Sequence, residues 1–427
     1  MCHRLICLIS AVLLLGVAGN ISAATVTWDD GGTGHGWSTP ENWDGDVPPA
    51  SGDSVVINVA PGPVIAGDVT IGGHIKVASV AGANTELTIE SGSLTTPAED
   101  TYSITILGGY GAGAHGALNV NGGVFDPSTS LWVGRDQTGT LNMTDGLIDL
   151  TNTAGGLDKW TRGVILGAKP GSTGYANIEG GIIKADIFSV GCAPESVGTV
   201  NMSGGTIITT PTAPEPDLLI GYEGTGHFNM SGGIINTEDV YLARTGGTGY
   251  MTMSDGSITA SDTFTLGLHT QEYGELTMTG GTVDVGTMFR CSDYGTANLS
   301  MTGGSINVAE TFYIIRRGSR GDEDTAGHVQ LDGGTIIAGD VQIDPEDSGW
   351  PATMDITGGT LIVSGDKTDI INGYVTDGWI TAYGGIGTVL CDYDVTTTDK
   401  TTVWAVPEPA TIMLLGLGGL ALIRRKT

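Results

Sequence analysis

The sequence predicts an all-β fold, namely a right-handed parallel β-helix of about eleven rungs, each 23–25 residues long. The chain of 427 residues contains 71 glycines and many threonines, which is typical of turns and strands rather than helices. The segment "VNMSGGTIIT" from Val200 returns with small changes from Phe228, Leu276 and Leu299. Between the two ends, no stretch has the apolar spacing of an amphipathic helix of ten or more residues.

The first predicted element is a secretory signal peptide at residues 1–24. Arg4 supplies the positive charge, residues 5–17 form a mostly apolar run, and Ser22, Ala23 and Ala24 offer small residues for cleavage near Ala24. An uncleaved membrane anchor is the alternative. The short apolar run and the cleavage site favour the signal peptide.

Residues 25–80 are expected to cap the first rung and to supply the first strands. Trp28, Trp37 and Trp43 precede a strand-like segment at residues 54–58. A coil of parallel strands ends in unpaired backbone groups, which must be covered. We therefore interpret the tryptophans as capping side chains, with stacking on sugars as the alternative. This opening, followed by the pattern "P..GD.V.I" from Pro49, resembles the start of β-helical surface proteins and autotransporter passengers.

Residues 81–365 form the predicted repeat, whose glycine corners lie 23–35 residues apart between Gly92 and Gly359. Period-two alternation places Leu141 and Met143 on one side of a strand and Asn142 on the other. One unit cannot bury its apolar side alone, so stacked units must share a core of Ile, Val, Leu, Phe and Met, with Thr, Asn, Ser and Asp outside. A β-propeller is the competing architecture, but its blades are usually about 40 residues or longer.

Charge and cysteine content exclude several classes of function. The formal net charge of −30 repels nucleic acid, so no nucleic-acid partner is expected. Cys192, Cys291 and Cys391 are about a hundred residues apart, which fits neither a disulfide framework nor a zinc site. We interpret them as single buried thiols.

No catalytic constellation is recognised, so we predict no enzyme, no catalytic residue and no cofactor. Asp145, Asp255 and Asp332 recur at glycine corners, where a short polar side chain bonds its own backbone. The "GHG" of residues 34–36 echoes one polygalacturonase motif, but the other motifs of that family are absent. A carbohydrate-active β-helix enzyme, either a polysaccharide lyase or a glycoside hydrolase, is the alternative. A groove lined by three or more carboxylates and a base would favour it.

Calcium is a weaker alternative. Two groups of acids could offer the oxygen ligands that this cation prefers; they are Asp322, Glu323 and Asp324, and Asp344, Glu346 and Asp347. Simple solvation of these acidic loops is the preferred interpretation.

Residues 366–405 are less repetitive and are expected to form the second cap. The tail of residues 406–427 has three parts, which are Val406-Pro407-Glu408-Pro409, an apolar run at 410–423, and Arg424-Arg425-Lys426. A fourteen-residue helix would be about 21 Å long, short for an unaided crossing of a core of roughly 30 Å. Flanking basic side chains can snorkel and hold that end in the cytoplasm.

This three-part tail closely resembles the PEP-CTERM sorting signal of Gram-negative bacteria. The resemblance implies recognition and cleavage by an exosortase, a transpeptidase-like membrane enzyme. By the same resemblance, the sorting motif is Val406, Pro407, Glu408 and Pro409, and the stop-transfer cluster is Arg424, Arg425 and Lys426. It further implies a transient membrane anchor, then a place at the cell surface or in the extracellular matrix, linked to polysaccharide and biofilm. An ordinary C-terminal anchor that is never processed is the alternative.

Together, these features predict an exported structural or adhesive protein. Its expected partners are an exosortase and extracellular polysaccharide.

Overall fold

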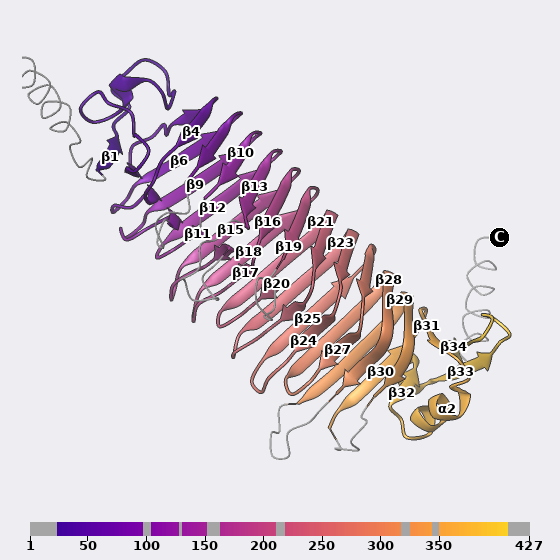
Figure 1. Cartoon of the computed structure of the whole chain (residues 1–427). Coiled ribbons are helices and arrows are strands. Elements are labelled where there is room, and N and C mark those ends of the chain that lie inside the picture. The colour runs from indigo at the N-terminus through magenta and orange to yellow at the C-terminus, as the bar shows by residue number, and fades with distance from the viewer. Residues whose placement is uncertain are drawn as a thin grey trace, which may run out of the picture.

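The computed structural model describes residues 24–96, 104–127, 130–151, 163–210, 218–316, 325–343 and 350–408. Over these residues the strands wind into a parallel coil with three faces, and a strand on one face pairs with the strand one turn later on the same face (Figure 1). The predicted parallel β-helix is therefore confirmed. The coil makes about 13 turns rather than eleven.

The strands of face 1 are β3 (Val64–Ile65), β6 (Asn84–Ile89), β9 (His115–Val120), β12 (Thr138–Met143), β15 (Thr173–Ile178), β18 (Val197–Met202), β21 (Thr225–Thr237), β23 (Thr248–Ala260), β25 (Tyr273–Met278), β28 (Thr296–Ile315), β29 (Ala326–Gln342), β30 (Ala352–Ile356) and β32 (Ile380–Ala382). Four of them continue around a corner, because β21 and β23 extend onto face 2 and β28 and β29 run over all three faces.

The further strands of face 2 are β4 (Asp68–Thr70), β7 (Ser93–Thr95), β10 (Val124–Asp126), β13 (Leu147–Leu150), β16 (Ile182–Ala185), β19 (Thr206–Thr209), β26 (Thr282–Val285) and β31 (Thr360–Ser364). Those of face 3 are β1 (Thr25–Trp28), β2 (Ser54–Ile57), β5 (Ile75–Val77), β8 (Ile104–Leu107), β11 (Ser130–Val133), β14 (Gly163–Leu166), β17 (Phe188–Val190), β20 (Leu218–Ile220), β22 (Val240–Leu242), β24 (Thr263–Gly267) and β27 (Met288–Ser292).

The two turns missing from the predicted count lie at the ends of the coil. The first uses Gly67 between β3 and β4, which follows Ala66, so the Gly-Gly, Asp-Gly or Ser-Gly pattern that marks the other corners is absent. In the last turn, helix α2 (Thr368–Thr376) follows β31, at the point where earlier turns have a face 3 strand, and β32 then pairs with β30. Counting these glycine corners could detect neither turn.

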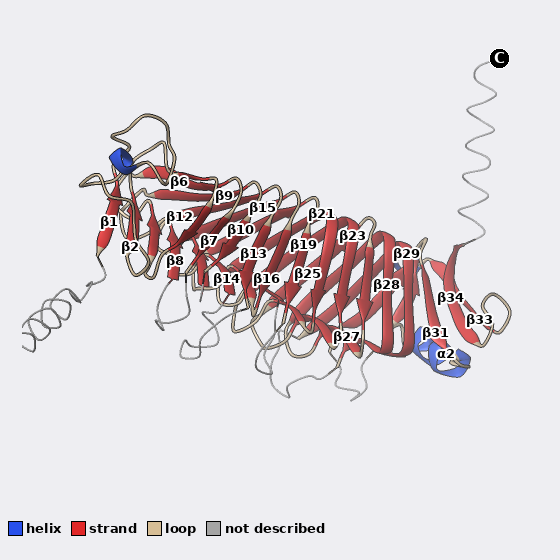
Figure 2. Ribbon diagram, turned by 45° about the horizontal axis from the view of Figure 1, so that its top comes forward, coloured by secondary structure: helices blue, strands red, loops and turns tan. Residues whose placement is uncertain are grey.

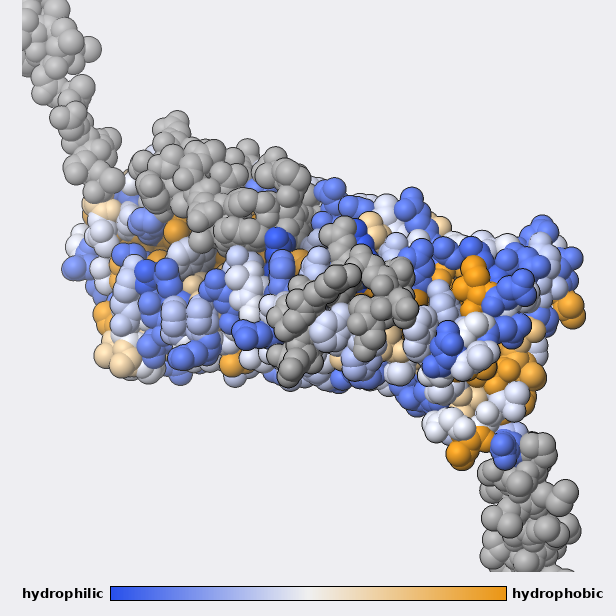
Figure 3. All heavy atoms as spheres, turned by 90° about the horizontal axis from the view of Figure 1, so that it is seen from below, coloured by the Kyte–Doolittle hydropathy of each residue, from blue (hydrophilic) through white to orange (hydrophobic). Residues whose placement is uncertain are grey.

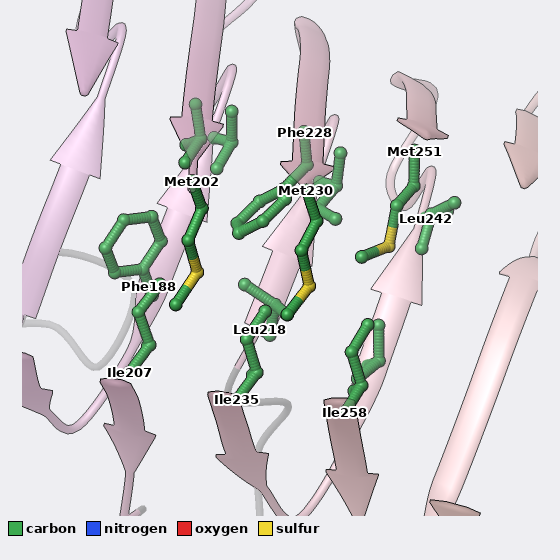
Figure 4. Close-up of a cluster of buried hydrophobic side chains, with 14 of the residues drawn as sticks. Phe188, Met202, Ile207, Leu218, Phe228, Met230, Ile235, Leu242, Met251 and Ile258 are labelled. Carbon is green, nitrogen blue, oxygen red and sulfur yellow. The ribbon is translucent and has the colours of Figure 1, made fainter. Parts of the chain in front are cut away.

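The core is a set of columns in which equivalent side chains stack from turn to turn. In β18 and β19 every second residue is buried, so Met202 and Ile207 point inward. Figure 4 shows the equivalent Met230 and Ile235 one turn later. Further along, the rings of Phe264, Phe289 and Phe312 are stacked, with neighbouring centroids 5.1 and 5.2 Å apart. The predicted inward column is confirmed.

Face 3 differs from the prediction, because in some of its strands, such as β11 and β14, the outward side is buried as well. All four residues of β11 and all four of β14 are buried, including the outward Trp132 and Ile165. A strand that is buried on both sides needs apolar residues without alternation. The apolar run "LWVG" from Leu131 has that pattern, so the second buried side has a signal in the sequence.

Both ends of the coil carry additional structure. At the first turn, the N–H of Trp37 bonds the carbonyl of Val64, and the N–H of Val64 bonds the carbonyl of His35, so the outer edge of β3 is paired. At the other end, β34 (Lys400–Pro407) pairs antiparallel with β31 and with β33 (Gly387–Tyr393) (Figure 2). Ile371 of α2 is fully buried in the core. Apolar colour gathers on this end in Figure 3.

Candidate functional site

The start of the predicted sorting motif lies in the last strand of the described residues. Val406 and Pro407 end β34 and pair with Thr388 and Gly387 of β33. Both are half-buried, and the following Glu408 is exposed. The motif therefore begins within the β33–β34 hairpin, with no linker between the folded body and the motif.

The rest of the tail lies outside the described residues. This applies to Pro409, to the apolar run and to the cluster of Arg424, Arg425 and Lys426. The predicted signal peptide also falls almost wholly outside them. Among the helices of the described ranges, none is long and apolar enough to cross a membrane.

A ladder of asparagine side chains runs along the outer side of face 1. Its members are Asn119, Asn142, Asn177, Asn201 and Asn229. Each amide Nδ2 donates to the Oδ1 of the asparagine one turn earlier, at 2.9–3.0 Å. At the ends, Asn119 donates to Thr88 and Thr252 donates to Asn229. The recurring Asn before the corner was visible in the sequence, but its side-chain bonding depends on the register between turns.

A shallow hollow of about 480 Å³ lies beside this ladder. It is lined by ladder asparagines and by a column of Ser and Thr side chains, and Glu179 is the one carboxylate in the lining. Such a surface offers hydrogen-bond donors and acceptors along the rod, but little acid–base chemistry.

A second hollow of about 460 Å³ lies on the same face, nearer the C-terminal end, and contains more titratable groups. Glu275 and Asp355 contribute carboxylates, and His328 contributes an imidazole. The strands of Glu275 and Asp355 are separated by three strand spacings, or about 14 Å. That exceeds the separation of roughly 5–9.5 Å between the carboxyl groups of glycosidases.

A closer carboxylate pair is held by hydrogen bonds from neutral groups. The Gln330 Nε2 donates to Asp332 at 2.7 Å and to Asp355 at 3.2 Å. The hydroxyls of Thr357 and Thr381 donate to Asp332 and Asp355, each at 2.6 Å. These carboxylates therefore serve as acceptors in a polar network that joins neighbouring turns.

The corner carboxylates behave largely as predicted. Asp145 accepts the N–H of Gly146 at 2.7 Å, and Asp255 accepts that of Gly256 at 2.8 Å. Local turn bonding is confirmed for these two residues. Asp332 is the exception, because it accepts hydrogen bonds from Gln330 and from Thr357 of the next turn.

The N-terminal aromatic residues form a buried cluster. Trp28, Trp37 and Trp43 are buried, and their rings meet edge to face with centroids 4.8–5.1 Å apart. They are therefore not exposed for stacking on a sugar. His35 of the "GHG" segment bonds Asp30 at 2.9 Å in the same region, separate from both hollows.

The three cysteines are free thiols. Cys291 is buried as predicted, and burial raises the pKa of its thiol strongly. Cys192 and Cys391 are only half-buried, so the prediction of buried thiols is wrong for these two.

Among the described residues, no group of three or more His, Cys, Asp or Glu side chains could hold a metal ion. The loop acids considered for calcium, which are Asp322, Glu323, Asp324, Asp344, Glu346 and Asp347, lie outside those residues.

Comparison with known proteins gives one match, at the C-terminus. Residues 405–426 match the family described as the PEP-CTERM protein-sorting motif. No curated protein and no solved structure matches the chain. The motif implies recognition by exosortase and export to the cell surface or the extracellular space.

Proposed function

Because the chain ends in a PEP-CTERM sorting motif, we propose that it is an exported structural or adhesive protein of a Gram-negative surface or biofilm matrix. An exosortase recognises Val406, Pro407, Glu408 and Pro409, while the apolar run and Arg424, Arg425 and Lys426 anchor the chain transiently in the membrane. The solenoid, which we take to be right-handed, then stands in contact with extracellular polysaccharide. The same proposal divides the chain into a signal peptide, an N-terminal cap, a repeat, a C-terminal cap and a sorting tail.

The motif match over residues 405–426 carries this proposal. The body supports it, because β34 leads directly from the last turn of the rod into the motif. A rod with its fold complete at Pro407 can be displayed as soon as the tail is processed. The hydrogen-bonded polar side chains of face 1 suit a displayed, water-facing surface.

We further propose that the body has no enzymatic activity. Neither hollow contains three carboxylates in its lining. The second hollow, with Glu275, Asp355 and His328, is nevertheless the place where the alternative of a polysaccharide lyase or glycoside hydrolase would have to act. Release of reducing ends or unsaturated sugars from host polysaccharide, lost in the Asp355→Asn variant, would favour that alternative.

Deletion of residues 409–427 tests the sorting proposal. The cut after Glu408 preserves β34 and its pairing with β31 and β33, so the body should keep its fold. In a host that bears an exosortase, we expect the truncated chain to appear in the medium or the periplasm and to be lost from the surface. The full-length chain in a host without exosortase is the matched control, and it should stay in the membrane. Unchanged surface display of the truncated chain would refute the sorting proposal.

A further inference from the structure

Basic side chains are concentrated along one edge of this acidic rod. The described residues contain nine lysines and arginines. Six of them lie on face 3 or at the corner that leads from face 3 to face 1, and they are Lys76, Arg135, Lys169, Arg244, Arg290 and Arg316. With a net charge of −30 over the whole chain, this distribution leaves the other faces almost without positive charge.

Three of these cations gather around two aromatic rings near the N-terminal end. The Nζ of Lys76 lies 5.7 Å from the ring centroid of Tyr110, and the guanidinium carbon of Arg135 lies 4.1 Å from it. The same guanidinium lies 5.6 Å from the ring of Trp132, and the Nζ of Lys169 lies 5.5 Å from that ring. These distances are within the range of cation–π attraction. We call these five residues the basic corner.

The basic corner spans four successive turns. Its residues lie on or directly after β5, β8, β11 and β14, which pair in that order. Four strands at a spacing of about 4.8 Å extend over roughly 14 Å of the rod. The cations thus form a line parallel to the rod axis, as contact with an extended polymer requires.

The positive charge of the basic corner is only partly neutralised. Arg135 forms an ion pair with Asp136. Within the described part of the chain, Lys76 and Lys169 form no ion pair with a carboxylate. Tyr110 is 58% exposed. Among the described residues, the corner therefore presents two ammonium groups without a carboxylate partner beside an accessible aromatic ring.

We infer that the basic corner is a binding site for a polyanionic polysaccharide, a sugar chain that bears carboxylate or sulfate groups. Ammonium and guanidinium groups attract the anionic substituents, and the exposed ring of Tyr110 offers an apolar surface to the carbon–hydrogen face of a sugar. The inference deepens the proposed contact with extracellular polysaccharide and rests on it, naming the charge of the polymer and its place on the rod.

Duplex DNA fits the corner less well. It carries about one negative charge per 1.7 Å of helix axis, so it would bring a dense, wide polyanion against the acidic faces beside the corner. A single sugar chain is narrower and has its charges further apart. It can follow one corner and avoid the flanking acids.

Binding to dextran sulfate, with uncharged dextran as the reference ligand, tests the inference. We use the full-length chain in a non-ionic detergent. The wild type should bind dextran sulfate, more weakly as salt rises, and should not bind dextran. The Lys76→Gln/Lys169→Gln double variant should bind about tenfold more weakly, as expected for the loss of two charge contacts from half-buried side chains.

The matched control is Lys184→Gln/Lys400→Gln, which removes the same charge from β16 and β34, and it should bind as the wild type does. Equal loss in both double variants, or no loss in either, would overturn the site. Binding of duplex DNA as tight as that of dextran sulfate would overturn the choice of polymer. The Tyr110→Ser variant keeps all three cations but removes the exposed ring. If this variant binds dextran sulfate as well as the wild type does, the corner attracts any polyanion through charge alone, and the assignment to a sugar polymer is overturned. None of these results depends on sorting, so failure here is distinguishable from failure of the export proposal.

Discussion

At the scale of single residues, the decisive property is which side of a strand a side chain occupies. Ile207 and Ile208 are neighbouring isoleucines in β19, so their intrinsic propensity for a strand is the same. Ile207 is fully buried in the core, and Ile208 is half-exposed on the outer side. Their different environments make this pair a direct test of the inward assignment.

Replacing Ile207 with Asp should lower the free energy of unfolding by several kcal/mol, because a buried charge would be left without a partner. Ile208→Asp is the control and should cost less than about 1 kcal/mol. Chemical denaturation followed by circular dichroism measures both changes. Equal effects would mean that the inward and outward sides of face 2 are misassigned.

Asp239, at the corner before face 3, makes stability depend on pH. Burial is the main cause that raises the pKa of its carboxyl above 3.8, while a hydrogen bond from the Thr263 hydroxyl acts in the opposite direction. The folded state then holds this proton more tightly than the unfolded state does. Its contribution to stability is therefore full below pH 3.8 and falls as pH rises through the folded pKa.

Asp239→Asn removes this titration, and its amide oxygen can still accept the N–H of Thr263. We expect the variant to be more stable than the wild type at pH 7, with the difference vanishing near pH 3. Urea denaturation of both proteins at the two pH values measures it. A difference of the same size at both would contradict the burial argument.

At the scale of elements, the corners decide whether successive turns can stack. Gly205 has a φ of 76°, and a Cβ at this position would lie 2.7 Å from the carbonyl oxygen of Gly180 in the preceding turn. Gly246 has a φ of 86°, but a Cβ there would meet nothing within 4 Å. Comparing alanine substitutions at these two glycines therefore separates the stability lost through a left-handed backbone from the stability lost through crowding between turns.

Gly246→Ala should cost roughly 1–2 kcal/mol of stability, the usual price of a left-handed conformation for a residue with a Cβ. Gly205→Ala should cost clearly more, because a backbone carbonyl of the neighbouring turn would have to shift. Thermal unfolding of the two variants compares them. A larger loss for Gly246→Ala would show that the corners are not in the close contact described.

The predictable elements are those whose signal is local. Alternation over a few residues predicted the inward Leu141 and Met143, and the glycine corners predicted most of the turns. The β33–β34 hairpin and the placement of α2 depend on contacts at the end of the coil, which have no local signature. The basic corner was also missed, because Lys76, Arg135 and Lys169 meet only once the register across insertions of different length is known.

At the scale of the whole molecule, the chain is an acidic rod with a sorting motif at one end. About 13 turns, at roughly 4.8 Å each, give a length of about 60 Å. The order from signal peptide through solenoid to tail is a prediction about how the rod is exported and displayed, and its central claim is processing by exosortase.

The mass of the chain recovered from the surface of exosortase-bearing cells tests that claim most directly. We predict a species that begins near residue 25 and ends close to residues 406–409, without Arg424, Arg425 and Lys426. In cells without exosortase, the same chain should retain residues 410–427 and remain in the membrane. A surface-displayed chain that still ends at Thr427 in both hosts would contradict the account.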